Sequence, residues 1–158
     1  MRGLPKRRRQ ENKTDYNARL SILKSGKARL LVRRSNRHII VQVVTSEKAQ
    51  DTVVLTVNSK DLLSHGWPEN KVGSLKSRPA AYLTGFLAAH TAAAKGIKEA
   101  VFDIGMHRNI SKSRLYAVLK GAIDAGLKIP HSVDVLPDQK LLESSETHQL
   151  INKIKEKI

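Results

Sequence analysis

Basic side chains are the residues of this sequence that are best placed to do chemistry, and the partner they suit is a polyanion. The 158-residue chain holds 29 lysines and arginines against 14 acidic residues, a net charge of +15. Thirteen of the basic side chains and only two acidic ones fall within residues 1–40. A strongly basic end on a nearly balanced body repels itself unless a counter-charge lies nearby, so the pattern predicts binding to nucleic acid. The simpler alternatives are a solvated charge run or a localisation signal at residues 6–9.

The aromatic residues indicate how a nucleic acid would be bound. The chain has three tyrosines, two phenylalanines and one tryptophan, whereas proteins that bind single strands use several exposed rings as stacking platforms. Phe86 and Phe102 stand in apolar runs and are expected in the core. Tyr16 stands in the basic segment, where it is a candidate either for base stacking or for packing. We therefore predict binding through phosphates and shape. A basic module that binds DNA is an alternative, although no major-groove motif is evident.

Motifs for catalysis are missing from the sequence. It has no cysteine, no phosphate-binding loop, no zinc-type histidine spacing and no serine in a nucleophile elbow. The enzymatic alternative is a metal-dependent nuclease on a ribonuclease H-like fold, which needs converging carboxylates. In that fold the first strand supplies a carboxylate, and residues 29–35 have none; Asp103 suits a loop-fixing or helix-capping role better. We predict no enzymatic activity, no metal and no cofactor.

Membrane association is not expected either. No stretch approaches about 18 uninterrupted apolar residues, and the first ten residues lack the apolar core of a secretory signal. The predicted location is the cytoplasm.

The elements that would position the basic residues follow from the spacing of the apolar ones. Residues 1–13 have no apolar period and are expected to form an extended arm, followed by a short helix that Thr14 and Asp15 can cap. Strands are predicted at 29–35, 38–45, 52–58, 99–105 and 127–129, and helices at 17–24, 79–95 and 113–125. The predicted fold class is α/β: a mixed sheet that opens with three antiparallel strands, then two α-β units whose helices pack on the sheet.

The expected domain organisation has three parts. A basic RNA-binding arm with a short helix covers residues 1–26, and a globular α/β core covers residues 27–135. A helical C-terminal tail covers residues 136–158, and we expect it to dock loosely or to be ordered by a partner.

Four blocks of the sequence resemble a known family. KTDYNARLSILKSGKARLLVRRSNRHIIVQVV (13–44) is similar to the N-terminal block of the large-subunit ribosomal protein that binds 5S rRNA, numbered eighteen in bacteria and archaea and five in eukaryotes. RPAAYLTGFLAA (78–89), GIKEAVFDIG (96–105) and KGAIDAGLKIPH (120–131) resemble its next three blocks. The resemblance covers about residues 6–138 and looks archaeal in type.

The resemblance implies a structural protein that binds 5S rRNA and helps attach it to the large-subunit rRNA in the central protuberance, beside neighbouring ribosomal proteins. The RNA contacts carried over to this chain come from the arm, the first hairpin, the connector and the start of the second long helix: Arg7, Arg8, Arg9, Lys13, Tyr16, Arg19, Arg33, Arg34, Asn36, Arg37, Lys71, Lys76, Arg78 and Arg114. Two segments depart from the family pattern. Arg114 falls where the family usually has a Gly-Ser-Arg turn, and NISKSR (109–114) replaces the usual proline and glycine there. The last seventeen residues differ from the usual short ending.

Overall fold

The helices and strands follow the predicted order closely. The structure is a computed structural model that describes residue 4 and residues 6–47, 50–138 and 145–158 of the chain. Its elements are α1 (Arg7–Gln10), α2 (Tyr16–Leu23), β1 (Ala28–Arg34), β2 (Ile39–Glu47), β3 (Gln50–Asn58), η1 (Ser59–Leu63), η2 (Glu69–Ser74), α3 (Arg78–Ala94), β4 (Ala100–Asp103), α4 (Arg114–Asp124), η3 (Val133–Val135) and α6 (Ser145–Lys155).

One mixed sheet carries the fold, with the strand order β3-β2-β1-β4. β2 pairs antiparallel with β1 and with β3, and β4 pairs parallel with β1. Side chains alternate between the two faces of a strand, so Leu30 and Val32 point to one face of β1 while Arg29, Leu31 and Arg33 point to the other. The predicted α/β class, with three antiparallel strands opening a mixed sheet, is confirmed.

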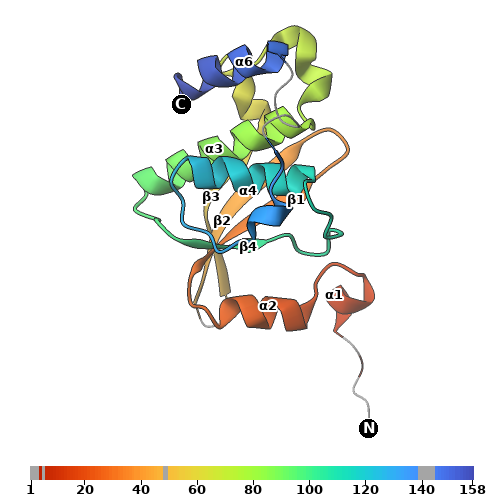
Figure 1. Ribbon diagram of the computed structural model, residues 1–158. Helices are drawn as coiled ribbons and strands as arrows, with labels where there is room; N and C mark the ends of the chain where they lie inside the picture. Colours follow the sequence, from red (N-terminus) through yellow and green to blue (C-terminus); the bar gives the residue numbers. More distant parts are fainter. Residues whose placement is uncertain (1–3, 5, 48–49, 139–144) are drawn as a thin grey trace.

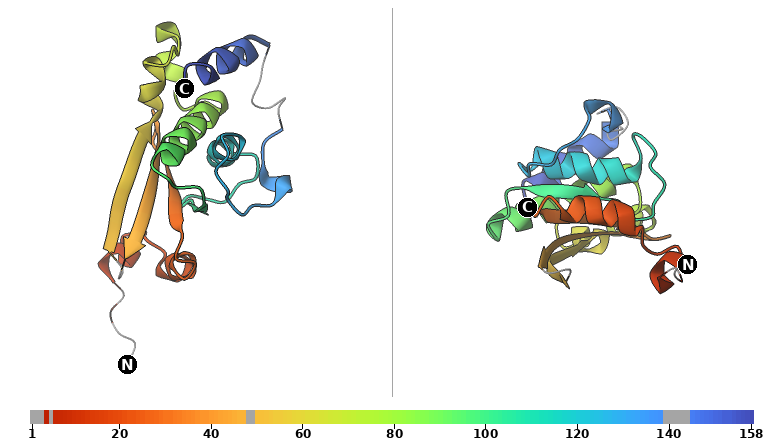
Figure 2. Two further views of the ribbon diagram at one scale, coloured as in Figure 1. Left: turned by 90° about the vertical axis from the view of Figure 1, so that its left-hand side faces the viewer. Right: turned by 90° about the horizontal axis from the view of Figure 1, so that it is seen from below.

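The long helices α3 and α4 cover one face of the sheet and run in the same direction, both beginning at the right-hand side of Figure 1. Leu30, Val32 and Val41 of the sheet and Leu83 and Val118 of the helices are fully buried between these layers. Helix α2 lies on the other side of the sheet, and the two views in Figure 2 show the same layering. Among the described helices, none is long and apolar enough to cross a bilayer.

Two glycines allow α3 and α4 to touch backbone to backbone. A Cβ atom at Gly85 would collide with the carbonyl oxygen of Val118, and a Cβ atom at Gly121 would collide with the carbonyl oxygen of Tyr82. Glycine costs about 1 kcal/mol relative to alanine inside a helix, so the close contact explains why both positions carry it.

Two details of the strands and of the arm differ from the sequence predictions. The last strand, predicted at 127–129, is reduced to a single parallel bridge between Glu99 and Lys128, because Pro130 follows at once and has no N–H for a ladder. Arg7–Gln10 of the arm forms one helical turn instead of an extended segment. Its backbone closes on the carbonyl of Lys6, and the Nε atom of Arg7 lies 3.7 Å from Glu11 Oε1, one turn further along.

The C-terminal tail is docked more firmly than predicted. Helix α6 packs on α3, and Ile151 and Ile154 are each only 1% exposed. The ammonium of Lys155 lies 4.8 Å from the ring centroid of Tyr82 and 5.5 Å from that of Phe86. The weak helix expected from the sequence is therefore held by the core of this chain itself. The part of the predicted tail at residues 139–144 lies outside the described residues.

The contact between α3 and α4 predicts a large difference between two glycine substitutions. Gly85→Ala is expected to lower the free energy of unfolding by about 1–3 kcal/mol or more, because a backbone oxygen cannot move aside as a flexible side chain can. Gly73→Ala is the matched control, since no heavy atom lies within 4 Å of a Cβ at that position. Its stability should change little, or rise by up to about 1 kcal/mol. Urea denaturation measures both, and equal stability of the two variants would contradict the close contact.

Candidate nucleic-acid interface

The basic arm is folded against the start of helix α2. The carboxylate of Asp15 accepts hydrogen bonds from the N–H groups of Asn17 (2.9 Å) and Ala18 (3.2 Å), which confirms the predicted N-cap. Thr14 is buried, and its hydroxyl accepts a hydrogen bond of 2.9 Å from Arg8 Nε. The start of α2 therefore fixes where the preceding basic residues leave the body.

Four of the predicted contact residues line one pocket between α2 and the face of the sheet that α3 and α4 leave uncovered. We call it the arm–sheet pocket; its basic lining residues are these four, Arg8, Lys13, Arg19 and Arg33, together with Arg29. Acidic groups also line it, and Arg19 is ion-paired with Asp51. Lys13 Nζ lies 2.8 Å from Glu11 Oε2. Part of the positive charge at this pocket is thus already balanced within the protein.

The fifth basic residue of this pocket, Arg29, is buried, and the sequence patterns did not single it out. Arg29 is only 4% exposed, and its guanidinium lies 2.7 Å from Asp51 Oδ1 and 3.0 Å from Asp103 Oδ2. Burial raises the pKa of Asp51, but the hydrogen bonds from Ser46 and Arg29 outweigh it, so that the pKa lies below its ordinary value. The only signal in the sequence was the alternation of β1, which places Arg29 on the same face as Arg33.

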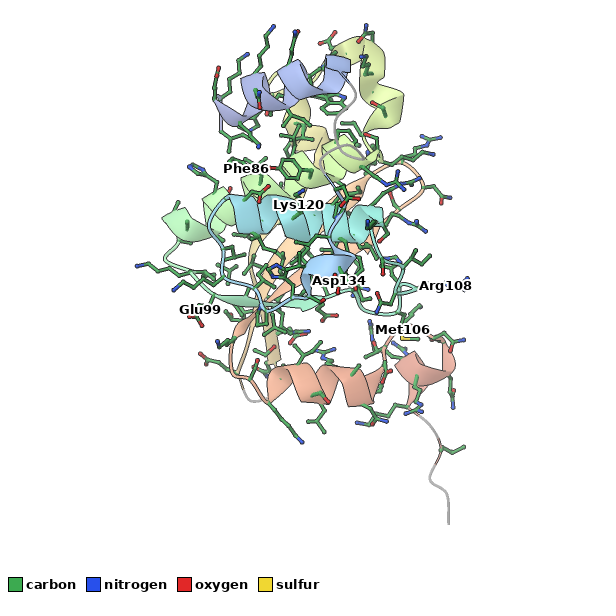
Figure 3. All side chains as sticks on the ribbon, viewed as in Figure 1. Phe86, Glu99, Met106, Arg108, Lys120 and Asp134 are labelled. Atoms are coloured by element: carbon green, nitrogen blue, oxygen red, sulfur yellow. The ribbon has the colours of Figure 1, made fainter. Side chains whose placement is uncertain are left out.

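Asp103 has the structural role that the sequence indicated. Besides the contact with Arg29, its Oδ1 atom accepts a hydrogen bond of 2.8 Å from the N–H of Gly105, which fixes the loop after β4. Glu99 lies at the other end of this strand, on the far side of the molecule from Met106 and Arg108 (Figure 3). Among the described residues, no three metal-binding side chains gather in one place.

A second set of predicted residues meets where the two long helices begin. Arg34 from the end of β1, Arg78 from the first residue of α3 and Arg114 from the first residue of α4 line one pocket, which we call the helix-start pocket. Lys112, which was not predicted, lines it too and has a φ of 57°, a conformation that glycine adopts more easily. The departure at NISKSR therefore leaves a lysine in the conformation of a glycine turn.

A third set lies at the tip of the first hairpin. Asn36, Arg37 and Lys76 line the hairpin–connector pocket together with Lys60, another basic residue that was not predicted. Burial, followed by the positive charges of Lys60 and Arg37, lowers the pKa of the neighbouring His38. Lys60 sits just after Asn58, whose side chain caps η1, and this capping sequence could have located it.

The remaining predicted residues do not join these pockets. Arg7 and Arg9 are exposed on α1, and Lys71 is exposed on η2. Tyr16 is half-buried, and the ammonium of Lys6 lies 4.6 Å from its ring centroid, so that a cation already occupies one face of the ring. Base stacking by Tyr16 stays a prediction.

The three pockets are neighbours, because one short stretch of chain contributes to all of them. Arg33 lines the arm–sheet pocket, Arg34 the helix-start pocket, and Asn36 with Arg37 the hairpin–connector pocket. The end of β1 and the turn after it thus contribute side chains to all three basic pockets. A protein that binds a polyanion such as nucleic acid is the class that this distribution of charge indicates.

Comparison with known proteins gives the family. A family model described as ribosomal large subunit proteins 60S L5 and 50S L18 matches residues 3–99 and 90–132. Large ribosomal subunit protein uL18 of Korarchaeum cryptofilum is 46% identical over 150 residues, covering 95% of this chain and 75% of that protein. The uL18 proteins of Halobacterium salinarum (47% over 135 residues, 85% and 72%) and Methanoculleus marisnigri (45% over 142 residues, 90% and 79%) are similar.

This chain therefore belongs to the uL18 family of large ribosomal subunit proteins, and these relatives are archaeal. As a member it is a structural constituent of the large subunit in the cytoplasm, with rRNA and ribosomal proteins as partners, and not an enzyme. The nuclease alternative is closed by this result, and the predicted family is confirmed.

His107, which lies beside the arginines at the end of β1, leads us to predict how the stability of the protein depends on pH. The Nε2 atom of His107 accepts a hydrogen bond of 3.2 Å from the N–H of Arg34. Burial, with the positive charges of Arg34 and Arg33, holds the pKa of His107 below its ordinary value of 6.5. Because the pKa of His107 is lower in the folded protein than in the unfolded chain, His107 binds its proton more tightly in the unfolded chain. The stabilisation is complete above about pH 6.5 and declines as the pH falls through the folded pKa.

We expect His107→Gln to weaken this pH dependence. Between about pH 7.5 and pH 5, the free energy of unfolding should fall less in the variant than in the wild-type protein, with His38 supplying the remaining slope. Urea denaturation at a series of pH values gives the two curves, and His90→Gln on the exposed side of α3 is the matched control. Parallel curves for wild type and His107→Gln would contradict the assignment.

Proposed function

We propose that this protein binds 5S rRNA and helps to attach it to the large-subunit rRNA in the central protuberance, beside neighbouring ribosomal proteins. The observation that carries the proposal is the gathering of the three basic pockets around the end of β1. Family membership supports RNA as the polyanion. The resemblance of four sequence blocks to the ribosomal protein family that binds 5S rRNA is the reason for proposing 5S rRNA in particular.

The contact surface that we propose combines the arm with the first hairpin. Residues 1–26 act as the RNA-binding arm, residues 27–135 as the core that carries the pockets, and residues 136–158 as the tail. The fourteen basic, amide and tyrosine side chains named from the sequence are the proposed contacts. Lys60 and Lys112 are added because they line the same pockets.

The chemistry of these side chains suits folded RNA. Each phosphate neutralised by a lysine or arginine releases condensed counterions, so that affinity depends steeply on salt. The planar guanidinium donates two parallel hydrogen bonds to phosphate oxygens and stacks on bases, and most of the proposed contacts are arginines. The described aromatic side chains are mostly buried or half-buried, which favours phosphate and shape recognition over base stacking.

Selective binding to 5S rRNA is the direct test. In a gel-shift titration with excess tRNA as competitor, the protein should retain 5S rRNA. The reason is that the proposed contacts would match the arrangement of phosphates on one folded RNA, 5S rRNA, and not on another. Equal competition by tRNA and by unlabelled 5S rRNA would contradict the proposal, since it would indicate charge attraction alone.

Replacing the arginines of α1 tests whether the arm binds phosphates. Arg7, Arg8 and Arg9 changed together to alanine should flatten the slope of log K for 5S rRNA against log salt by about 2, at roughly 0.7–0.9 for each phosphate that the variant no longer neutralises. The control removes the same charge from exposed positions outside the pockets, with alanine at Lys98, Lys128 and Lys153. The two triple variants would have equal slopes if only net charge mattered, and that result would exclude a phosphate-binding arm.

A further inference from the structure

The helix-start pocket differs from the arm–sheet pocket in its charge. Four cationic side chains line it, and no carboxylate is found among its described lining residues. Lys112 is engaged, since its ammonium lies 2.9 Å from Asp138 Oδ2 outside the pocket. Arg34, Arg78 and Arg114 form no ion pair with a carboxylate of any described residue. Three arginines thus line one pocket without a balancing carboxylate among the described residues.

Two helix starts add further positive potential to the same space. α3 begins at Arg78 after the N-cap Ser77, and α4 begins at Arg114 after Ser113. Because the two helices run side by side in the same direction (Figure 1), their positive dipole ends lie together. Both serines line the pocket.

The start of α4 also lacks the side-chain hydrogen bond that caps the start of α3. The hydroxyl of Ser77 accepts a hydrogen bond from the N–H of Ala80, as a cap should. Ser113 makes no such bond, and its Oγ atom is buried without a hydrogen-bond partner among the described residues. First-turn N–H groups of α4 are therefore left without a side-chain acceptor, beside a buried hydroxyl that can donate. An anion with several acceptor oxygens would satisfy both.

We propose that the helix-start pocket holds a single phosphate group of the rRNA backbone, gripped jointly by Arg34, Arg78, Arg114 and the first turn of α4. This inference rests on the proposed function for the identity of the ligand as rRNA. The ability of the pocket to bind a phosphate group does not depend on that function. The three arginines act on one phosphate as a unit. They do not each bind a separate phosphate, as their separation in the sequence would suggest.

Inorganic phosphate tests the pocket in the free protein. In ¹H–¹⁵N spectra at constant ionic strength, phosphate should shift the amide signals at the starts of α3 and α4 in a saturable way. Arg78→Ala with Arg114→Ala should abolish these shifts. Lys98→Ala with Lys128→Ala, which removes two exposed charges just after the other ends of the same helices, should retain them. Circular dichroism confirms that each variant is folded. Absent shifts in the wild-type protein, or shifts that survive in Arg78→Ala with Arg114→Ala, would overturn the inference.

The salt dependence of RNA binding tests the sharing of one phosphate. Replacing Arg34, Arg78 and Arg114 together by alanine should flatten the slope of log K against log salt by about 0.7–0.9, the value for one phosphate. A decrease of about 2 or more would mean three separate phosphates and would overturn the inference. Phosphate-induced shifts without selectivity for 5S rRNA would support the pocket and contradict the proposed function. Selective binding of 5S rRNA without those shifts would support the proposed function and contradict the phosphate pocket.

Discussion

The backbone contact between α3 and α4 is the constraint on which the rest of the structure depends. Gly85 and Gly121 let the two helices pack more closely than any side chain would permit, and the pair then covers one face of the sheet. Because both helices run in the same direction, their starts come together beside the end of β1. The close packing that builds the core therefore also assembles the helix-start pocket.

The buried arginine and the exposed arginines differ in whether carboxylates lie beside them. Arg29, buried between the strands and α2, has two aspartates and a serine around its guanidinium. Since a buried charge without a partner is costly, this network is structural. The arginines at the helix starts have no such carboxylates among the described residues, and the hairpin–connector pocket is lined by none either. That contrast separates the structural arginine in the body from the basic side chains for which we propose contacts with RNA.

Local patterns predicted most of the fold, and tertiary packing decided the rest. Alternating β-branched residues located β1, β2 and β3, and Pro79 with Gly96 bounded α3. The strand at 127–129 was too short for periodicity to separate it from a single bridge. Residue types and the basic arm indicated nucleic acid, but no pattern could group Arg34, Arg78 and Arg114, because the helix contact brings them together. Arg29 was missed since burial by α2 is not encoded in its own strand.

An electron cryo-microscopy structure of the large ribosomal subunit containing this protein tests the central claim most directly. We expect the end of β1 and all three pockets to face 5S rRNA or the adjoining large-subunit rRNA, with one phosphate between the starts of α3 and α4. If the end of β1 faced solvent while another surface of the protein lay against the RNA, the central claim would be contradicted.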